Sequence, residues 1–496
     1  MKRRDFCRTA VAAGIVMTLP ACGRNGGPSN DLPQTIDAVS LDGNELSIER
    51  AAVTELADSL QGSLYLSGDD GYDTARKVWN GMFDDRRPAM VVQCASSDDV
   101  RNAVLFARDR QLLLSVKGGG HSFPGKSVAD RGMMLDLSQM QAVTVDADAG
   151  IATVAGGALL GHLDSATLAH EMATTAGIVS HTGVGGFTLG GGMGRTDRLH
   201  GLAIDNLLSA SVATADGRLL RASADENPDL FWAIRGGGGN FGVVTEFEFR
   251  LHPFDPTVYA GVLVFPFDAA RDLIRVWAEH KDDWPRELNA EPSLFVNPEG
   301  DRIAMLEICY AGDPADGEKV VAPLLAVAKP VAGELGPMSY QAMQTMYDAA
   351  TAHGQLNYLK SGLIGEITEP FIDAMVGNYE GEHLPWAWFQ HLGGAISDVD
   401  PTATAYAHRE AGYNNGMSAT WQDPAESEAR IAKIRAYYKA LEPFMGGFYT
   451  NLNEDTEANT WGNYRENYPR LSDIKAKYDP TNLFRMNANI RPASKS

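Results

Sequence analysis

Three glycine-rich stretches, at 118–120, 182–194 and 236–242, constrain the fold of this chain more than any other feature. A glycine inside a helix or strand costs about 1 kcal/mol relative to alanine, so such runs are unfavourable in regular elements. Their advantage is that bare backbone can approach a ligand closely and point its N–H groups at an anion such as a pyrophosphate. The sequence therefore predicts an extended ligand that lies against exposed backbone.

The first glycine run lies between a short apolar strand and a histidine. The apolar residues at 112–116 predict the strand, and the run Lys117-Gly118-Gly119-Gly120-His121-Ser122 follows it. An earlier strand at 90–94 and a helix capped by a serine complete a β-α-β unit. Farther along, strand patterns at 142–145 and 151–154 predict a hairpin, and a helix is expected at about 159–172. The histidine places a nucleophilic side chain beside a bound cofactor, and the alternative is a glycine turn with an incidental histidine.

The second glycine run, at 182–194, does not resemble a flexible linker. Val184, Phe187, Leu189 and Met193 interrupt its glycines, and it has no serine-rich character. The density of glycine also argues against an ordinary helix or strand at this place. We therefore expect a segment whose backbone approaches the ligand.

The third run contains the pattern Gly-x-Gly-x-x-Gly at 237–242. A dinucleotide-binding Rossmann motif needs a strand before this pattern and a helix after it. Here a helical pattern at 229–234 precedes it, and an alternating strand pattern at 243–251 follows it. Three glycine runs around one histidine thus indicate a large nucleotide bound without a Rossmann unit.

The length and charge of the chain limit the classes of protein to which it can belong. Its 496 residues exceed one ordinary domain. We expect an N-terminal helical segment at 34–83, a cofactor domain at 84–255 completed by 446–496, and a substrate domain at 256–445. The net charge of −22 argues against nucleic acid and against a polybasic membrane surface.

The cysteines point to neither a metal site nor a disulfide framework. Cys94 and Cys309 are the two that lie in the body of the chain, and no cysteine pair has metal-ligand spacing. We expect both to be buried free thiols, with a single bridge between them as the alternative.

Residues 1–33 are predicted to be an export leader and tether rather than part of the fold. Arg3 and Arg4 match a twin-arginine signal, which exports proteins that are already folded, often with a cofactor loaded. A short apolar stretch then leads to Leu19-Pro20-Ala21-Cys22, which resembles a bacterial lipoprotein cleavage site. The alternative is a plain cleavable signal in which Cys22 is incidental. We therefore expect a periplasmic or cell-surface location, with membrane contact only through a lipid on Cys22.

Taken together, the motifs after residue 80 resemble one protein family. They are the three glycine runs, the segment Asp229-Leu230-Phe231-Trp232, and the C-terminal stretches Asn467-Tyr468-Pro469-Arg470 and Tyr478-Asp479-Pro480. These resemble the berberine-bridge-enzyme-like branch of the vanillyl-alcohol-oxidase and p-cresol-methylhydroxylase (PCMH) superfamily. The resemblance implies an α+β fold: a two-lobed PCMH-type FAD-binding domain with an antiparallel-sheet substrate domain capped by helices.

The resemblance also implies FAD bonded covalently, through its 8α-methyl group, to His121. An imidazole can add to the electrophilic methide form of the flavin, and the bond anchors the cofactor and raises its potential. No metal is expected. The residues expected to bind FAD are His121, Lys117, Gly118, Gly119, Gly120, Ser122, Thr182, Gly183, Gly185, Gly186, Gly190, Gly192, Gly242, Val244, Asn487 and Asn489.

Two positions depart from the family pattern. Val179 occupies the place of the cysteine that forms a second flavin bond in bicovalent members, so we expect a single bond. Leu452 occupies the place of a tyrosine that serves in base catalysis, and leucine cannot accept a proton. The candidates for a base elsewhere, although most buried tyrosines and histidines are core residues, are His391, Tyr406, Tyr413 and Tyr449.

The expected activity is that of an oxidase acting on an alcohol, sugar or similar small organic substrate. A base takes a hydroxyl or amine proton while hydride moves to flavin N5, and O2 then accepts the electrons to give H2O2. Thr182 is small, which is compatible with oxygen access. The alternatives are a dehydrogenase that uses a periplasmic electron carrier and a catalytically inactive flavin-binding protein. The sequence specifies neither the substrate nor the oligomeric state.

Overall fold

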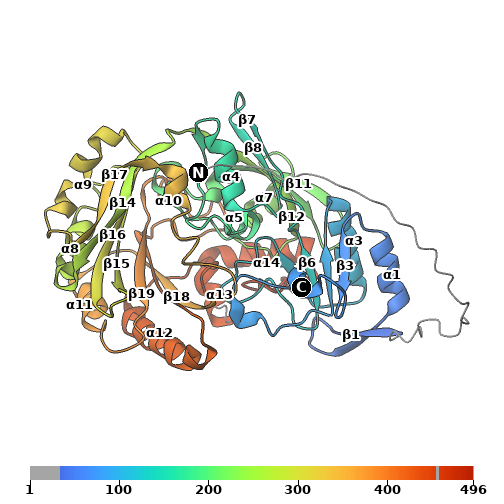
Figure 1. Ribbon diagram of the computed structural model, residues 1–496. Coiled ribbons are helices and arrows are strands. Elements are labelled where there is room, and N and C mark those ends of the chain that lie inside the picture. Colours follow the sequence, from blue (N-terminus) through green and yellow to red (C-terminus); the bar gives the residue numbers. More distant parts are fainter. Residues whose placement is uncertain (1–33, 454–456, 495–496) are drawn as a thin grey trace, which may run out of the picture. The chain divides into compact units, whose positions relative to one another are not determined.

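The computed structural model describes residues 34–453 and 457–494. Its first lobe contains a four-stranded sheet (Figure 1). The predicted β-α-β unit is present: α3 joins the first and second strands of the unit, and the Ser96 hydroxyl caps the helix by accepting from the Asp99 N–H. The two strands are not neighbours, because a third strand lies between them and pairs in parallel with both. The order of strands is β3 (Ser63–Leu66), β4 (Met90–Gln93), β6 (Met133–Asp136) and β5 (Leu114–Lys117), with α3 at Ser97–Asp109.

The N-terminal segment at 34–83 is not the helical segment that we predicted. It contains a hairpin of β1 (Thr35–Val39) and β2 (Glu45–Glu49), then α1 (Arg50–Asp58), β3 and the one-turn α2 (Tyr72–Ala75). The hairpin buries Ala38 and Ile48 in the same apolar cluster as the first sheet and α3. Packing on a distant part of the chain therefore decides its structure, rather than local helical tendency.

The second lobe is a five-stranded antiparallel sheet. Its order is β11 (Leu219–Ser223), β10 (Leu207–Ala213), β12 (Val243–Arg250), β8 (Ile151–Ala155) and β7 (Val143–Asp146), and the predicted hairpin is the pair β7–β8. The helix α7 (Pro228–Ile234) precedes the third glycine run and β12 follows it, which confirms that this run is not a Rossmann motif.

Two predictions in this lobe need correction. The helix expected to reach residue 172 is α4 (Leu160–Leu168), because β9 (Met172–Ala173) pairs with β13 (His252–Pro253). The second glycine run contains a helix after all, α5 (Val184–Leu189). Buried Val184, Phe187 and Leu189 supply the packing that offsets the unfavourable glycines.

The substrate domain is a seven-stranded, wholly antiparallel sheet with helices on one face, as predicted. Figure 1 shows α8, α9 and α11 on one side of this sheet, where apolar side chains of sheet and helices form a single core. The strand order is β17 (Ala332–Ser339), β14 (Thr257–Pro266), β16 (Arg302–Tyr310), β15 (Leu288–Val296), β19 (Trp386–His391), β20 (Tyr413–Trp421) and β18 (Leu356–Ile364). The helices are α8 (Ala270–Glu279), α9 (Gly317–Leu325), α11 (Glu369–Gly377) and α12 (Ser427–Leu441).

A short segment at 79–81 joins the first lobe to the substrate domain. The Trp79 indole N–H donates to the Thr351 carbonyl oxygen at 2.6 Å. The Asn80 side-chain amide donates both to the Phe123 carbonyl oxygen, at 2.8 Å, and to that of Asn357, at 2.9 Å. The two domains are therefore connected by buried hydrogen bonds next to the first glycine run.

The C-terminal segment closes the cofactor lobes. Its helices are α13 (Glu457–Tyr464) and α14 (Tyr468–Tyr478). The fully buried Lys475 ammonium donates to the carbonyl oxygens of Asn240, at 2.6 Å, and Phe484, at 3.0 Å, and pairs with Asp479 at 2.7 Å. Asn240 lies in the third glycine run, so the end of the chain fixes that run in place.

Two further predictions concern thiols and the leader. Cys94 and Cys309 are both buried free thiols, as expected. The expected leader, with Arg3, Arg4 and Cys22, lies outside the described residues. Within 34–453 and 457–494, none of the helices has both the length and the apolar character needed to span a membrane.

Candidate functional site

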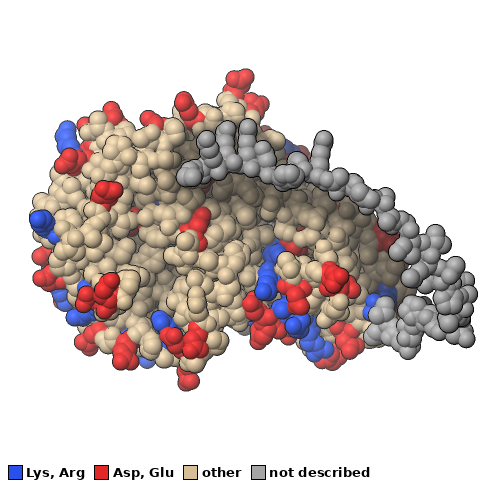
Figure 2. Space-filling model, in the orientation of Figure 1, with Lys and Arg blue, Asp and Glu red and all other residues tan. Residues whose placement is uncertain are grey.

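A cavity of about 1320 Å³ lies between the glycine-rich lobes and the helix-free face of the seven-stranded sheet. Its lining comes from all three glycine runs, from α5, from strands β15, β16, β18 and β19, and from the C-terminal residues 484–488. On the face of the molecule in Figure 2, acidic and basic side chains gather toward the margins, and the middle consists mostly of uncharged residues.

The first two glycine runs are pressed against each other. A Cβ atom on Gly119 would lie 2.3 Å from the backbone nitrogen of Gly183, and one on Gly183 would lie 2.2 Å from that of Gly119. In the third run, Gly242 has φ +156° and a Cβ there would lie 2.6 Å from the Ala213 carbonyl oxygen. The cradle thus requires glycine at these places, because any side chain would separate the backbones that form its wall.

Most of the residues predicted to bind FAD line this cavity. They are His121, Gly118, Gly119, Gly120, Ser122, Thr182, Gly183, Gly185, Gly186, Gly242, Val244 and Asn487. Neighbours that were not predicted include Trp79, Lys126 and Val243.

Lys117, Gly190, Gly192 and Asn489 do not line the cavity, so the predictions for these four need correction. The Lys117 ammonium points away into the first lobe, where it donates to the Ala75 carbonyl oxygen at 2.7 Å and lies 3.2 Å from the Asp136 carboxylate. Gly190 and Gly192 serve internal packing: a Cβ on the first would lie 2.1 Å from the Asn451 side chain, and one on the second 2.4 Å from that of Ala203.

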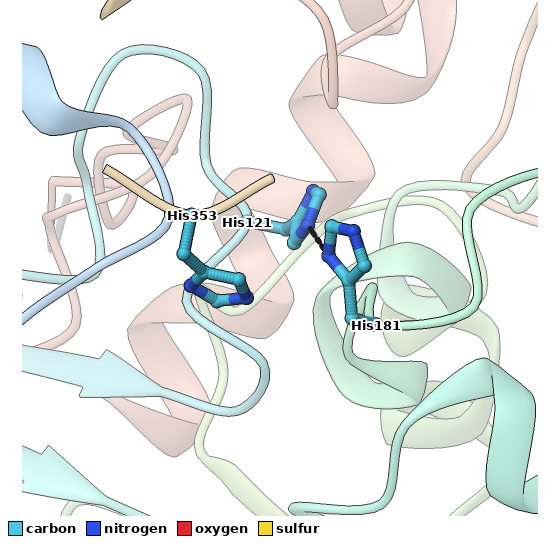
Figure 3. Close-up of side chains that lie close together, drawn as sticks. All are labelled: His121, His181 and His353. Carbon is cyan, nitrogen blue, oxygen red and sulfur yellow. Dashed lines mark hydrogen bonds between the residues drawn. The ribbon is translucent and has the colours of Figure 1, made fainter. Parts of the chain in front are cut away.

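His121 lies at the centre of a group of three histidines (Figure 3). Its Nε2 is 2.6 Å from Nδ1 of His181, and His353 approaches from the substrate domain with ring centroids 6.0 Å apart. The Trp79 indole stacks on the imidazole at 4.4 Å. Burial, then the neighbouring His181 and His353, hold the pKa of His121 well below its usual range. The imidazole is therefore neutral and nucleophilic at neutral pH.

The segment 347–353 brings the substrate domain to this histidine. Its Asp348 carboxylate accepts from the backbone N–H of Ser180 at 2.9 Å and from the Ser180 hydroxyl at 2.6 Å. The Thr351 hydroxyl lies 3.4 Å from Nε2 of His181. The position of this segment could not be predicted from the sequence, because the residues that it contacts here are more than 160 positions away in the chain.

Three of the four predicted bases lie outside the cavity lining. His391 is buried on the core side of β19, stacked on Tyr413 at 5.9 Å, because alternation along the strand places Trp386, Trp388 and Gln390 on the cavity side instead. Tyr406 is buried against Gly191 and Gly236.

Tyr449 is the candidate base that lines the cavity, near Leu452. Its hydroxyl accepts from the Gly192 N–H at 3.0 Å and from the Asn451 side-chain amide at 2.9 Å. Burial raises the pKa of Tyr449 to about 12. Its phenol is therefore protonated at neutral pH and serves as a poor base.

Two carboxyl groups on the sheet form the acidic part of the cavity wall. Glu291 on β15 lies directly opposite Glu307 on β16, and both line the cavity. Glu307 is buried and pairs with Arg195, whose Nε lies 2.7 Å from Oε1, and it also accepts from the Tyr347 hydroxyl. Glu291 faces the cavity and, within the described residues, has no direct ion pair like that of Glu307.

Comparison with known proteins agrees with this geometry. Residues 88–223 match a family model for an FAD binding domain, and residues 449–491 match one described as berberine and berberine like. An FAD-linked oxidoreductase of Dictyostelium discoideum is 30% identical over 89% of this chain and 97% of its own. The chain belongs to the berberine-bridge-enzyme-like family of FAD-linked oxidoreductases.

Two further relatives show how varied this family is. Glucooligosaccharide oxidase of Sarocladium strictum is 28% identical over 85% of this chain and 91% of its own. The crystal structure of 6-hydroxy-D-nicotine oxidase from Arthrobacter nicotinovorans, 28% identical, superimposes with a TM-score of 0.80 over 88% of this chain and 99% of that one. The fold of this oxidoreductase is therefore the one that the family resemblance implied.

Sequence reasoning missed the functional groups of this oxidoreductase that come from the sheet and from 347–353. His181 directly precedes the cavity residue Thr182, and this position was a usable signal. Glu291 and Glu307 interrupt otherwise apolar strands, which was a second signal. Their pairing depends on strand register, which the sequence does not reveal.

Proposed function

We propose that this oxidoreductase is an exported oxidase that removes hydride from a small alcohol, sugar or amine, with its FAD held by one covalent bond to His121. The observation that carries the proposal is the buried, neutral His121 imidazole at the wall of a cavity formed by three glycine runs. Relatives that are named as oxidases of 6-hydroxynicotine and of glucooligosaccharides support a small polar organic substrate.

The residues present fit FAD. A cavity of about 1320 Å³ exceeds the size of ordinary small-molecule pockets, as a dinucleotide requires. Gly118, Gly119 and Gly183 supply bare backbone for the pyrophosphate. Lys126 also lines the cavity, and burial lowers the pKa of its amine to about 7. When bound, FAD supplies the two-electron acceptor that the side chains of a protein lack.

The surroundings of His121 favour a single bond made through one ring nitrogen. Its Nε2 is already engaged with His181 at 2.6 Å, which leaves Nδ1 for the flavin. Val179, at the place of the second attachment in bicovalent relatives, lines the cavity but has no nucleophilic atom. Stacking on Trp79 holds the imidazole plane.

Acid precipitation tests the covalent bond. The wild-type precipitate should stay yellow, and a His121→Ala variant should release its flavin into the supernatant. A His170→Ala variant is the matched control, because His170 is an exposed histidine outside the cavity lining. Free FAD in the wild-type supernatant would contradict the proposal.

The acceptor is proposed to be O2, since small Thr182 lines the cavity and leaves space at its wall. The second candidate is a dehydrogenase with a periplasmic electron carrier. Protein reduced without air should regain its yellow colour within seconds of aeration. Protein that stays bleached for many minutes in air would favour the dehydrogenase.

The proposal of export rests on Arg3, Arg4 and Cys22, which precede the described residues. A variant with Arg3→Lys and Arg4→Lys should be retained in the cytoplasm, because the twin-arginine pathway reads both arginines. A Cys22→Ser variant should still be exported but should leave the membrane fraction. Unchanged export of the double lysine variant would exclude this pathway, and unchanged membrane association of Cys22→Ser would exclude the lipid anchor.

A further inference from the structure

The helix-free face of the substrate sheet carries a pair of carboxyl groups in direct register. Glu291 and Glu307 are cross-strand partners on β15 and β16, and both lie on the cavity face. Side chains in such positions are about 5 Å apart at Cβ, and two like charges there destabilise a sheet. The pair is therefore stable only when one of the two carboxyl groups holds a proton or when a positive charge lies beside them.

A direct ion pair within the described residues reaches only one of the two carboxyl groups. The Arg195 guanidinium contacts Glu307 at 2.7 Å and is itself held by the Gln344 side-chain oxygen at 2.9 Å, and the Tyr347 hydroxyl donates to the other oxygen of Glu307. Among the same residues, Glu291 accepts one hydrogen bond, from the His391 backbone N–H at 3.2 Å. Glu291 thus faces the cavity without a direct ion pair of its own.

Aromatic rings on the same face of the sheet line one small pocket together with Glu291. Trp386 and Trp388 lie on the neighbouring strand β19, and Tyr347 packs against Trp386 with centroids 5.3 Å apart. All three line the cavity with Glu291. Aromatic faces beside a carboxylate are the surroundings in which proteins bind organic cations, through cation–π attraction and ion pairing together.

We propose that Glu291, with Glu307 opposite it and Trp386, Trp388 and Tyr347 around it, binds the ammonium group of an amine substrate and accepts its proton. This inference rests on the proposed function, since it assumes that the same cavity holds FAD. Glu307 and Arg195 act as positioning residues. They form an ion pair beside Glu291, and they act on the substrate through Glu291.

The charges that face Glu291 explain how it changes its protonation. Burial and then the charge of Glu307, with a smaller effect of Asp197, raise the pKa of Glu291 to about 8, although Arg195 and the His391 N–H lower it. Tyr347 is neutral, because burial and Glu307 hold its pKa above the usual range. Without a cation, Glu291 therefore carries a proton at neutral pH, and an arriving ammonium group expels that proton to solvent.

The bound ammonium group then transfers one proton to the Glu291 carboxylate. One N–H bond of the ammonium breaks, its electron pair stays on nitrogen, and an O–H bond forms on the Glu291 carboxylate. The substrate is then a neutral amine, whose lone pair can assist loss of hydride from the adjacent carbon. FAD, when bound, would supply the two-electron acceptor for that hydride, and the organic product would be an iminium ion.

A binding experiment tests the site independently of flavin chemistry. Benzyltrimethylammonium is a suitable probe, because it is permanently charged and has no N–H proton to give. Calorimetric titration of the purified flavoprotein at pH 6.5, in two buffers of different ionisation enthalpy, should show release of about one proton for each probe bound. The uncharged tertiary alcohol 2-methyl-1-phenyl-2-propanol, which has the same shape, should bind on the order of 100-fold more weakly and release none.

Variants assign the effect to Glu291. Glu291→Gln should lose the proton release and weaken binding of the probe by on the order of 100-fold, whereas Glu291→Asp should retain the release. Glu334→Gln, an exposed glutamate on β17 of the same sheet, is the matched control and should behave as wild type. Each variant should keep wild-type flavin content, which shows that it has folded.

Three results would overturn the inference: equal binding of the charged and uncharged probes, proton release that persists in Glu291→Gln, or binding of xylobiose with an affinity above that of the cation. Failure of the proposed function gives a different pattern. Colourless acid-precipitated protein would refute covalent FAD, and the probe would still bind to the site at Glu291 with proton release.

Discussion

Ser180 holds the Asp348 carboxylate twice, with its backbone N–H on one oxygen and its hydroxyl on the other. Ser180 belongs to the segment that leads into the second glycine run, and Asp348 belongs to the substrate domain. This contact holds the segment 347–353 against the histidines, where Tyr347 and Thr351 line the cavity. The position of the substrate domain relative to His121 therefore depends in part on this carboxylate.

Asp348→Ala should loosen this wall. We expect a loss of about 1–3 kcal/mol in the free energy of unfolding, because two hydrogen bonds to a charged, partly buried acceptor disappear. Urea unfolding followed by fluorescence measures the loss. Asp148→Ala, at an exposed position in the turn between β7 and β8, is the control and should stay within experimental error of wild type. Equal free energies of unfolding for the two variants would show that the contact between Ser180 and Asp348 does not stabilise the fold.

His181→Gln should reduce covalent flavin attachment by about tenfold, the size of effect seen when the hydrogen-bond partner of a functional histidine is removed. The imidazole of His121 would lose the neighbour that engages Nε2 at 2.6 Å. The measurement is the fraction of total flavin that survives acid precipitation. His170→Gln serves as the control, and a full covalent fraction in His181→Gln would mean that Trp79 alone orients His121.

Three alanine substitutions separate the roles of the glycines. Gly119→Ala should abolish flavin retention, because its Cβ would lie 2.3 Å from the Gly183 nitrogen and would force the two runs apart. Gly186→Ala should fold normally but retain less flavin, since Gly186 lines the cavity and its Cβ would meet nothing within 4 Å. Gly336→Ala, on β17 and equally open, should change neither property. Melting temperature and bound flavin measure the two effects, and normal flavin in Gly119→Ala would contradict the packing described.

Acidification should destabilise the protein between pH 6.5 and 4 in part through His408. Its Nε2 lies 3.0 Å from the Gly462 carbonyl oxygen, and burial lowers the pKa of His408 to about 4. The unfolded chain, with a histidine pKa near 6.5, binds more protons in this window, so stability falls as the pH falls. The contribution approaches about 1.4 kcal/mol per pH unit.

His408→Gln should flatten the pH dependence of unfolding by up to that amount, whatever its effect on stability at pH 7. Denaturant unfolding at several pH values between 4 and 7 provides the slope. His200 has a pKa lowered to about 4 as well and titrates in both proteins, so the difference isolates His408. Parallel slopes for the two proteins would exclude this role.

The sequence was informative where the structure depends on local pattern. The serine cap of α3, the β7–β8 hairpin, and the order of α7, glycine run and β12 could all be predicted, because each depends on neighbouring residues. The cavity residues Gly119, His121 and Gly183 followed from glycine density, since only close backbone approach explains it. Local reasoning thus identified the cofactor half of the site.

The rest depends on contacts between distant segments. The strand β6 comes after β5 in the chain but lies between β4 and β5 in the sheet, and the β-α-β pattern does not predict this order. His391 was assigned to the wrong face of β19, because an alternating strand fits two opposite orientations until its packing is known. Glu291 and Glu307 are 16 residues apart and meet only through register.

The surroundings of His121 have a consequence for how the protein matures. Its neighbours come from three stretches of chain: Trp79 from the N-terminal segment, His181 from the second lobe, and His353 from the substrate domain. These meet only when both domains have docked, so the proposed attachment of flavin to His121 would occur only in a molecule whose assembly is complete. Under the proposed function, the bound colour of each molecule would then be a permanent sign that it had reached its native state.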